Sequence, residues 1–333
     1  MTAHHHSTPS QPVCTPLSGS WIDFHHPNPL EGGYWNETTR RFTCEDWRTK
    51  VAEMAAFGID TLVVESVMLR GKSFYPSKWV PAQWDHACRD PLGAVFQEAD
   101  RHGMTVYPGV GFFSEQTGKT EADDREQILR REVPLELHAR YGHHRSFAGW
   151  YLPVEAPIQG YFPEDYIRYV NELAAHCKKP DASRKILIAP YGTRTVKADQ
   201  HYVEQLRRLE ADHMAYQDEV GVQKTTPSEL DAIFRRLREC HDQAGKPLWA
   251  DVEIFSFEGP VYGSRLVPAP FERVRAQIEA VSPHAEKLLC YQYLGMVNSS
   301  VNNVYAGHAR SLEFARDYRL WVRTRLGCAA ERS

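Results

Sequence analysis

Long apolar runs are missing from this sequence of 333 residues. No stretch of about eighteen consecutive apolar residues occurs, so a membrane-spanning helix is not expected. The N-terminal stretch MTAHHHSTPSQPVC also lacks the apolar core of a secretory signal. Basic clusters are rare too, because 39 Lys and Arg are interspersed with 43 Asp and Glu and leave a net charge of −4. The sequence therefore predicts neither a nucleic-acid nor a membrane partner, and it leaves the oligomeric state open.

Cysteines at metal-binding or disulfide-framework spacing are missing as well. The seven cysteines are scattered from Cys14 to Cys328 without a CxxC pair, which argues against a zinc site and against a disulfide framework. Together with the missing export signal, this pattern predicts a cytoplasmic protein.

Motifs for cofactors and for activated nucleophiles are also absent. The sequence contains no GxGxxG or GxxxxGK[ST] phosphate loop, no GxSxG nucleophile elbow and no HExxH zinc motif. We therefore expect no cofactor.

What the sequence does contain is a regular alternation of short apolar runs and amphipathic helical stretches. The strand-like runs are 19–24, 61–66, 104–110, 147–155, 185–190, 212–219, 247–255 and 287–295. The helical stretches are about 44–57, 91–102, 121–141, 163–177, 200–209, 227–244, 271–281 and 307–325. Such an alternation predicts one α/β domain, a (β/α)8 TIM barrel over residues 19–326, with a disordered tail at 1–18 and a short tail at 327–333.

Acidic side chains stand at or just after several of the predicted strand ends. In a (β/α)8 barrel these ends surround the active site. A single acid there often caps a helix or pairs with an arginine. Several acids from different strands would instead meet in one small volume, where like charges destabilise the fold unless they are used. The acids in question are Asp23, Glu65, Glu155, Asp218, Glu219 and Glu253.

Aromatic residues are frequent in the same strand ends and loops. Aromatic faces beside acids and amides are what a sugar needs, because its apolar face stacks and its hydroxyls form hydrogen bonds. The predicted substrate is therefore a carbohydrate. The predicted substrate-binding residues are Asp23, His25, Trp35, Glu65, Tyr151, Tyr191, Tyr216, Gln217, Glu219, Phe255, Tyr291 and Gln292.

Two glutamates are placed to act as a catalytic pair. Glu155 ends the fourth predicted strand and Glu253 the seventh, which lie across the barrel mouth from each other. Such a pair hydrolyses a glycosidic bond when one carboxylic acid protonates the leaving oxygen and the other attacks the sugar or activates water. We assign Glu155 as general acid/base and Glu253 as nucleophile or base, with Asp218 as the substitute for either.

Two other functions remain open from the residues alone. The acids Glu65, Glu155, Asp218 and Glu253 could together bind Mg²⁺ or Mn²⁺ in a sugar isomerase or lyase. The barrel could also bind a carbohydrate without turning it over.

Three segments carry a resemblance to known proteins: GWYLPVE (149–155), QDEVG (217–221) and WADVEIF (249–255). With GSWIDFHHPN, FGIDTLVVES and HGMTVYPGVGF, they resemble a family of uncharacterised barrel proteins regarded as glycoside hydrolases. The resemblance spans about 19–326 and implies that Glu155, Asp218 and Glu253 are the functional acids. A looser similarity links the chain to the retaining barrel glycosidases, in which Asn precedes the strand-four glutamate. Here Val154 stands at that position.

Overall fold

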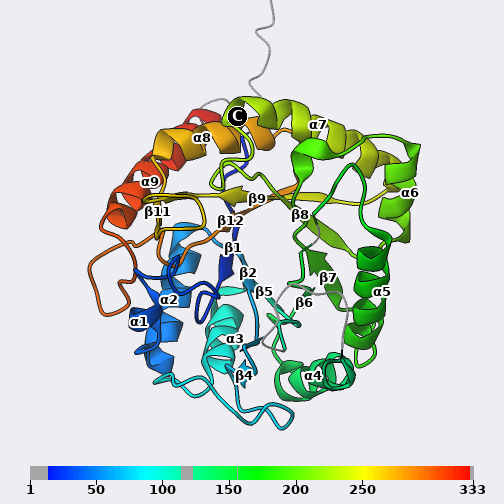
Figure 1. Cartoon of the computed structure of the whole chain (residues 1–333). Coiled ribbons are helices and arrows are strands. Elements are labelled where there is room, and N and C mark those ends of the chain that lie inside the picture. The colour runs from blue at the N-terminus through cyan, green and yellow to red at the C-terminus, as the bar shows by residue number, and fades with distance from the viewer. Residues whose placement is uncertain (1–13, 114–122, 156, 331–333) are drawn as a thin grey trace, which may run out of the picture.

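The computed structural model of the chain describes residues 14–113, 123–155 and 157–330, and its centre is a barrel of parallel strands (Figure 1). The strands are, in chain order, β1 (Gly19–Ile22), β2 (Thr61–Val64), β5 (Thr105–Pro108), β6 (Gly149–Tyr151), β7 (Lys185–Ile188), β8 (His213–Gln217), β9 (Leu248–Glu253) and β12 (Lys287–Tyr291). Their order in the sheet is β5-β2-β1-β12-β9-β8-β7-β6. Parallel bridges from Val106 to Phe147 and from Gly109 to Tyr151 join the two outer strands and close the ring.

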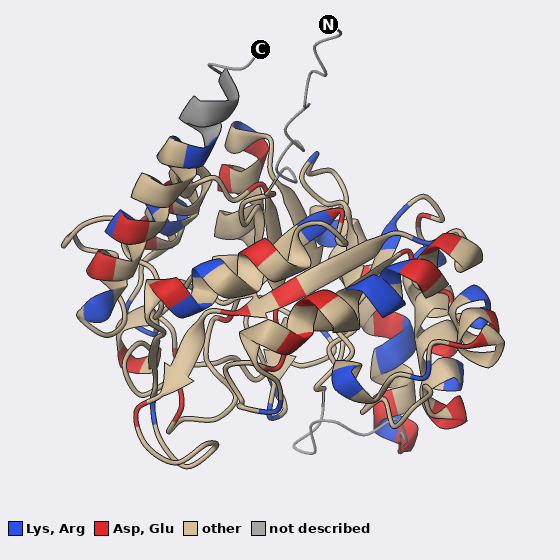
Figure 2. Ribbon diagram, turned by 90° about the horizontal axis from the view of Figure 1, so that it is seen from above, with Lys and Arg blue, Asp and Glu red and all other residues tan. Residues whose placement is uncertain are grey.

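A helix follows each strand of the barrel and packs against its outside (Figure 1). These helices are α2 (Cys44–Phe57), α3 (Pro91–His102), α4 (Asp124–Tyr141), α5 (Glu164–Lys178), α6 (Gln200–Arg208), α7 (Pro227–Ala244), α8 (Phe271–Val281) and α9 (Arg310–Ala330). Acidic and basic residues are interspersed along these helices (Figure 2). The predicted (β/α)8 barrel is confirmed. Within the described residues, no helix combines the length and the hydropathy needed to cross a bilayer.

Local capping signals explain why several helices begin and end where the sequence predicts. At the start of α2, Thr43 Oγ1 accepts a hydrogen bond from the Asp46 N–H at 3.1 Å, and Asp46 Oδ2 accepts one from the Thr43 N–H at 2.9 Å. At its end, Gly58 adopts φ 109°, a left-handed conformation that glycine favours. Gly103 and Gly245 end α3 and α7 in the same way.

The two faces of the strands have different surroundings. One cluster of apolar side chains fills the barrel and takes a residue from every strand: Trp21, Val63, Tyr107, Tyr151, Leu187, Ala215, Trp249 and Leu289. All of these residues have odd numbers. Even-numbered neighbours such as Ile22, Val106 and Trp150 belong to the larger cluster between the strands and the helices. Because side chains alternate along a strand, odd-numbered strand residues point into the barrel.

Small elements in the loops were not predicted from the sequence. They are the helix α1 (Asn36–Thr39), the 3₁₀ turn η1 (Thr193–Thr195), the hairpin β3 (Met68–Leu69) with β4 (Lys72–Ser73), and the hairpin β10 (Phe255–Phe257) with β11 (Leu266–Pro268). The second hairpin matters most for function, since it extends the wall of the barrel mouth beyond β9.

Two predicted boundaries differ from the structure, and a third cannot be compared with it. The tail predicted at 1–18 is too long, because Leu17 is buried and its N–H donates to the Tyr318 hydroxyl at 2.9 Å; residues 1–13 lie outside the described residues. The tail predicted at 327–333 is also too long, since α9 continues to Ala330. The start predicted for the third long helix, Glu121, lies outside the described residues.

The cysteine prediction is corrected at one pair. Cys44 at the start of α2 forms a disulfide with Cys88, just before α3. The two residues are 44 positions apart in the chain, so only the folded structure brings their sulfur atoms together. The cytoplasmic location stays a prediction, and the cysteines no longer support it, because disulfides are rare in that compartment.

Candidate active site

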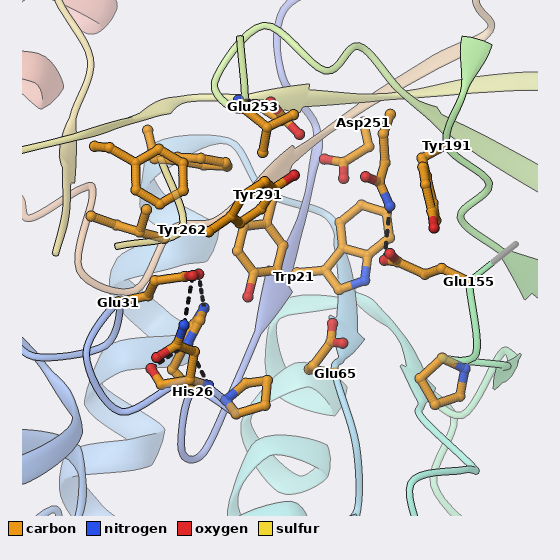
Figure 3. A pocket seen from close by; sticks show the side chains of 18 of the residues that line it. Trp21, His26, Glu31, Glu65, Glu155, Tyr191, Asp251, Glu253, Tyr262 and Tyr291 are labelled. Carbon is orange, nitrogen blue, oxygen red and sulfur yellow. Dashed lines mark hydrogen bonds and ion pairs between the residues drawn. The ribbon is translucent and has the colours of Figure 1, made fainter. Parts of the chain in front are cut away.

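A cavity of about 600 Å³ opens at the C-terminal ends of the strands (Figure 3). This is the end of the barrel where the sequence places the chemistry. The lining residues from strands and strand ends are Trp21, Glu65, Pro153, Glu155, Tyr191, Gln217, Asp251, Glu253, Phe255 and Tyr291. The loops contribute His26, Pro27, Asn28, Glu31, Phe112, Val222, Lys224, Phe257, Tyr262 and Leu266.

Glu155 follows β6 and is accessible from the cavity. Its Oε1 accepts a hydrogen bond of 2.8 Å from Gln217 Nε2 at the end of β8. The surrounding protein reduces the solvation of the carboxylate and raises its pKa to about 7, although the bond from Gln217 and the charge of Lys224 act the other way. Near neutral pH, Glu155 therefore exists in both protonation states, as a general acid/base must.

Glu253 ends β9 and is 3 % exposed. Its Oε2 accepts a hydrogen bond of 2.9 Å from the Val222 N–H. Burial, followed by the charge of Asp218, raises its pKa to about 8. Gly221 allows this close approach, because a Cβ atom there would lie 2.9 Å from Glu253 Oε2. The glycine of the QDEVG segment is thus explained by the position of the carboxyl group.

Two further carboxyl groups lie in the same cavity, from Glu65 after β2 and Asp251 within β9. Burial raises the pKa of Glu65 well above its usual value, and the charges of Glu155 and Asp23 add to the shift. Burial also raises the pKa of Asp251 well above its usual value, with contributions from Glu253, Asp218, Glu155 and Glu65. The cavity therefore holds several acids that lie close enough together to raise one another's pKa.

Aromatic side chains form much of the cavity wall. Trp21 and Tyr291 come from neighbouring strands, and Tyr191 stands opposite Tyr262 (Figure 3). Tyr262 belongs to the loop of the β10–β11 hairpin and is 55 % exposed. The Lys224 ammonium lies 4.8 Å from the centre of the Tyr191 ring. These rings offer flat apolar faces on which a sugar can stack.

The structure brings together seven of the residues predicted from the sequence. Glu65, Glu155, Tyr191, Gln217, Glu253, Phe255 and Tyr291 all line the cavity. The other predicted residues do not line it, and they fall into three groups.

Tyr216 and Asp218 have even numbers and face away from the barrel interior. The Tyr216 hydroxyl lies 2.8 Å from that of Tyr202 and 3.0 Å from His241 Nε2, between β8 and the helices. Asp218 is fully buried, and Gln277 Nε2 of α8 donates to its Oδ2 at 2.6 Å. The assignment of Tyr216 to substrate binding and of Asp218 as a substitute acid is therefore corrected, since neither reaches the cavity.

Asp23, Trp35 and Gln292 form a buried group beside the cavity. Trp35 Nε1 donates to Asp23 Oδ1 at 3.2 Å, and Gln292 Nε2 donates to Asp23 Oδ2 at 3.1 Å. These contacts hold the loop after β1 against the strand end at β12. The three side chains support the wall of the cavity and do not line it.

His25, Tyr151 and Glu219 are also used within the protein. The His25 ring stacks on Trp84 with 4.5 Å between centres, and Tyr151 is buried against Trp21 in the barrel. Glu219 Oε2 accepts hydrogen bonds from the N–H groups of Gly192 and Thr193 at 2.8 and 3.0 Å. Glu219 therefore fixes the loop after β7.

Some lining residues were not predicted as site residues: Trp21, His26, Asn28, Glu31, Phe112, Lys224, Asp251, Phe257 and Tyr262. Strand alternation could have found Asp251, which lies two residues before Glu253 and so shares its face. No such signal marks Glu31 or Lys224, whose positions depend on loop conformation.

A divalent metal ion would need several acidic side chains close together. Within the described residues, no group of three or more His, Cys, Asp and Glu side chains is arranged to hold a metal ion together. The four acids proposed as alternative metal ligands are not gathered, because Asp218 lies behind the strand that carries Glu253.

Comparison with known proteins places the chain in a family. Residues 17–303 match the family described as Domain of unknown function (DUF4434). The chain belongs to this family. The resemblance carried by the GWYLPVE, QDEVG and WADVEIF segments is thereby confirmed. None of the curated proteins matches the chain.

Several solved structures share the barrel of this DUF4434 protein. A putative α-L-fucosidase from Bacteroides thetaiotaomicron superimposes with a TM-score of 0.72 at 19 % identity, over 96 % of this chain and 98 % of that one. An endo-β-1,4-mannanase from Thermotoga petrophila gives 0.57 at 12 % identity, over 92 % and 76 %. A β-galacturonidase from Eisenbergiella tayi gives 0.54 at 13 % identity, over 92 % and 51 %. The fold is thus a glycosidase-like barrel.

Proposed function

We propose that this DUF4434 protein is a glycoside hydrolase in which Glu155 is the general acid/base and Glu253 the nucleophile or base. One observation carries the proposal. The two carboxyl groups reach the same aromatic-lined cavity from β6 and β9, which lie on different sides of the barrel mouth (Figure 3). A bound sugar would place its glycosidic bond between them.

The surroundings of the two acids suit these roles. Glu155, with a pKa of about 7, retains a proton for the leaving oxygen near neutral pH and can later remove one from water. The Val222 N–H donates to Glu253 Oε2 and opposes the burial and the Asp218 charge that raise the pKa of Glu253 to about 8. Attack on the anomeric carbon requires the anionic form, so we expect activity through Glu253 to rise with pH toward that value. Gln217 holds the Glu155 carboxylate from the side and stands on an inward-facing position of β8.

The comparisons support a carbohydrate substrate and do not choose among sugars. The names of the similar structures include enzymes of neutral sugars, a fucosidase and a mannanase, and enzymes of acidic sugars, a galacturonidase and three β-glucuronidases. A metal-dependent isomerase or lyase is less favoured, because the four acids that it would use do not share one cavity.

The test is a hydrolysis screen on aryl glycosides and oligosaccharides, with and without EDTA. We expect wild-type turnover that EDTA leaves intact and that Glu155→Gln and Glu253→Gln each lower by a factor of about 10² or more. Glu286→Gln is the control, since Glu286 pairs with Arg238 on the surface at 2.8 Å. Turnover lost to EDTA would indicate the metal enzyme, and sugar binding without turnover would indicate a binding protein.

A further inference from the structure

The cavity lining contains many more acidic than basic side chains. Carboxyl groups come from Glu31, Glu65, Glu155, Asp251 and Glu253. The basic side chains among the described residues of the lining are Lys224 and His26, and there is no guanidinium group. His26 Nε2 lies 3.8 Å from Glu31 Oε2. Lys224 is already engaged, because its Nζ lies 3.5 Å from Glu219 Oε1 and over the Tyr191 ring. The cavity thus presents many hydrogen-bond acceptors and little positive charge.

Asp251 is the most unusual of these acids. It is 3 % exposed, it lines the cavity, and its Oδ1 has no hydrogen-bond partner among the described residues. Its carboxyl group points into the space between Glu253 and Trp21 (Figure 3). A buried polar atom without a partner destabilises a fold, so such an atom in a cavity indicates a bound group that supplies the partner.

Glu65 resembles Asp251 from the other side of the cavity. It follows β2, lines the same space and lies close enough to Glu155 and Asp23 for their charges to raise its pKa. Asp218, a buried acid outside the cavity, differs because its two oxygens accept hydrogen bonds from Gln277 and from backbone N–H groups. Both unusual acids therefore face the ligand space.

We propose that Asp251 and Glu65 accept hydrogen bonds from the sugar unit held in the cavity, and that the cavity selects sugars without negative charge. Hydroxyl and ammonium groups are donors that satisfy a carboxyl oxygen, whether it is ionised or not. The carboxylate of a uronic acid would instead add a negative charge beside carboxyl groups that already raise one another's pKa. The basic side chains of the described lining, Lys224 and His26, are paired with Glu219 and Glu31. The choice of a sugar as ligand rests on the proposed function.

Matched sugars test the proposal by binding alone. Glucose with glucuronic acid, galactose with galacturonic acid, and glucosamine would be compared by ligand-observed NMR and thermal shift. We expect the neutral and amino sugars to bind at least roughly tenfold more tightly than the uronic acids. Equal or tighter binding of the uronic acids, or no binding of any neutral or amino sugar, would overturn the proposal. Glucose against glucosamine then shows whether hydroxyl or ammonium donors are preferred.

Two variants assign the selectivity to residues. Asp251→Asn and Glu65→Gln should each reduce the preference for uncharged sugars, and Glu286→Gln should leave it unchanged. If Asp251→Asn fails to fold, Glu65→Gln carries the test. An unchanged preference in the folded variants contradicts the proposal. This test measures binding and not turnover, so its outcome is distinct from that of the hydrolysis screen. Selective binding by a protein that hydrolyses no sugar would refute only the proposed glycosidase activity. Hydrolysis of uronides that depends on Glu155 would refute only the proposed selectivity.

Discussion

Buried acids on the outer and inner faces of β8 and β9 differ in the hydrogen bonds that they accept from the protein. Behind the strands, Asp218 accepts hydrogen bonds from Gln277 Nε2 at 2.6 Å and from the N–H groups of Val220 and Glu253, both at 3.2 Å. Inside the barrel, Asp251 is equally buried, yet its Oδ1 has no partner in the described part of the chain. The protein supplies hydrogen bonds that stabilise the outer acid, whereas the described residues supply none to Oδ1 of the inner acid.

This difference separates supporting residues from binding residues better than burial or pKa does. Burial raises the pKa of Asp218 to about 6, that of Glu253 to about 8 and that of Asp251 well above its usual value. All three would count as functional candidates on that criterion. The hydrogen bonds that the protein supplies rank them differently: Asp218 accepts three, Glu253 accepts one from the Val222 N–H, and Asp251 Oδ1 accepts none within the described residues.

The largest effect is expected for Asp218→Ala. The substitution leaves the Val220 and Glu253 N–H groups without the Asp218 acceptor and the Gln277 amide with only the Glu253 carbonyl oxygen, so we expect the free energy of unfolding to fall by about 3 kcal/mol. Urea denaturation measures this loss. Asp218→Asn is the matched control, because its side-chain oxygen still accepts from the Val220 and Glu253 N–H groups. A loss below about 1 kcal/mol for the alanine variant would contradict the supporting role of Asp218.

Asp251→Asn should instead stabilise the protein, and only above acidic pH. In the folded state Asp251 holds its proton well above its usual pKa, while the unfolded chain releases it near pH 4. Stability is therefore present at low pH and is lost as the pH rises toward the folded pKa. Asparagine does not titrate, so we expect the variant to match the wild type at pH 4 and to exceed it by about 1–2 kcal/mol at pH 8.

Asp212→Asn provides the opposite case. The pKa of Asp212 is lowered, since the Ile186 N–H and the ammonium groups of Lys178 and Lys185 together outweigh the effect of burial. Its stabilisation is present at neutral pH and is lost as the pH falls through the folded pKa. Removing this charge should lower stability at pH 8 and have less effect at pH 3. The same pH dependence for both variants would refute the contrast.

The sequence predicts the architecture well, because the signals for it are local. Gly58 and Gly103 end helices where their left-handed backbone is needed, and the apolar runs give the eight strands in order. It also predicts which end of the barrel carries Glu65, Glu155 and Glu253. These conclusions need no knowledge of long-range contacts.

The sequence predicts less well which strand side chains point into the barrel and which point toward the helices. In a buried parallel strand both faces are apolar, so alternation leaves little trace in a run such as that around Tyr216. If Glu253 is known to face inward, Asp251 two residues before it must face inward too and joins the predicted site residues. Gln217 is paired with Asp251 and also faces inward, so its neighbour Tyr216 faces outward and leaves the predicted site residues. The Cys44–Cys88 pair and the position of Tyr262 depend on loop structure, which no periodic pattern encodes.

The smallest effects are expected for two substitutions that each remove one hydroxyl group, one on the outer face of the strands and one on the cavity wall. Tyr216→Phe deletes the hydroxyl between Tyr202 and His241, and we expect a loss of about 1 kcal/mol in unfolding free energy with unchanged turnover and sugar affinity. Tyr191→Phe deletes a hydroxyl on the cavity wall, and we expect the reverse: stability within about 0.5 kcal/mol of the wild type and weaker sugar binding. Denaturation and binding are measured on both variants. If Tyr216→Phe weakens sugar binding as much as Tyr191→Phe does, the outer face contributes to recognition, and the division between supporting and binding residues is wrong.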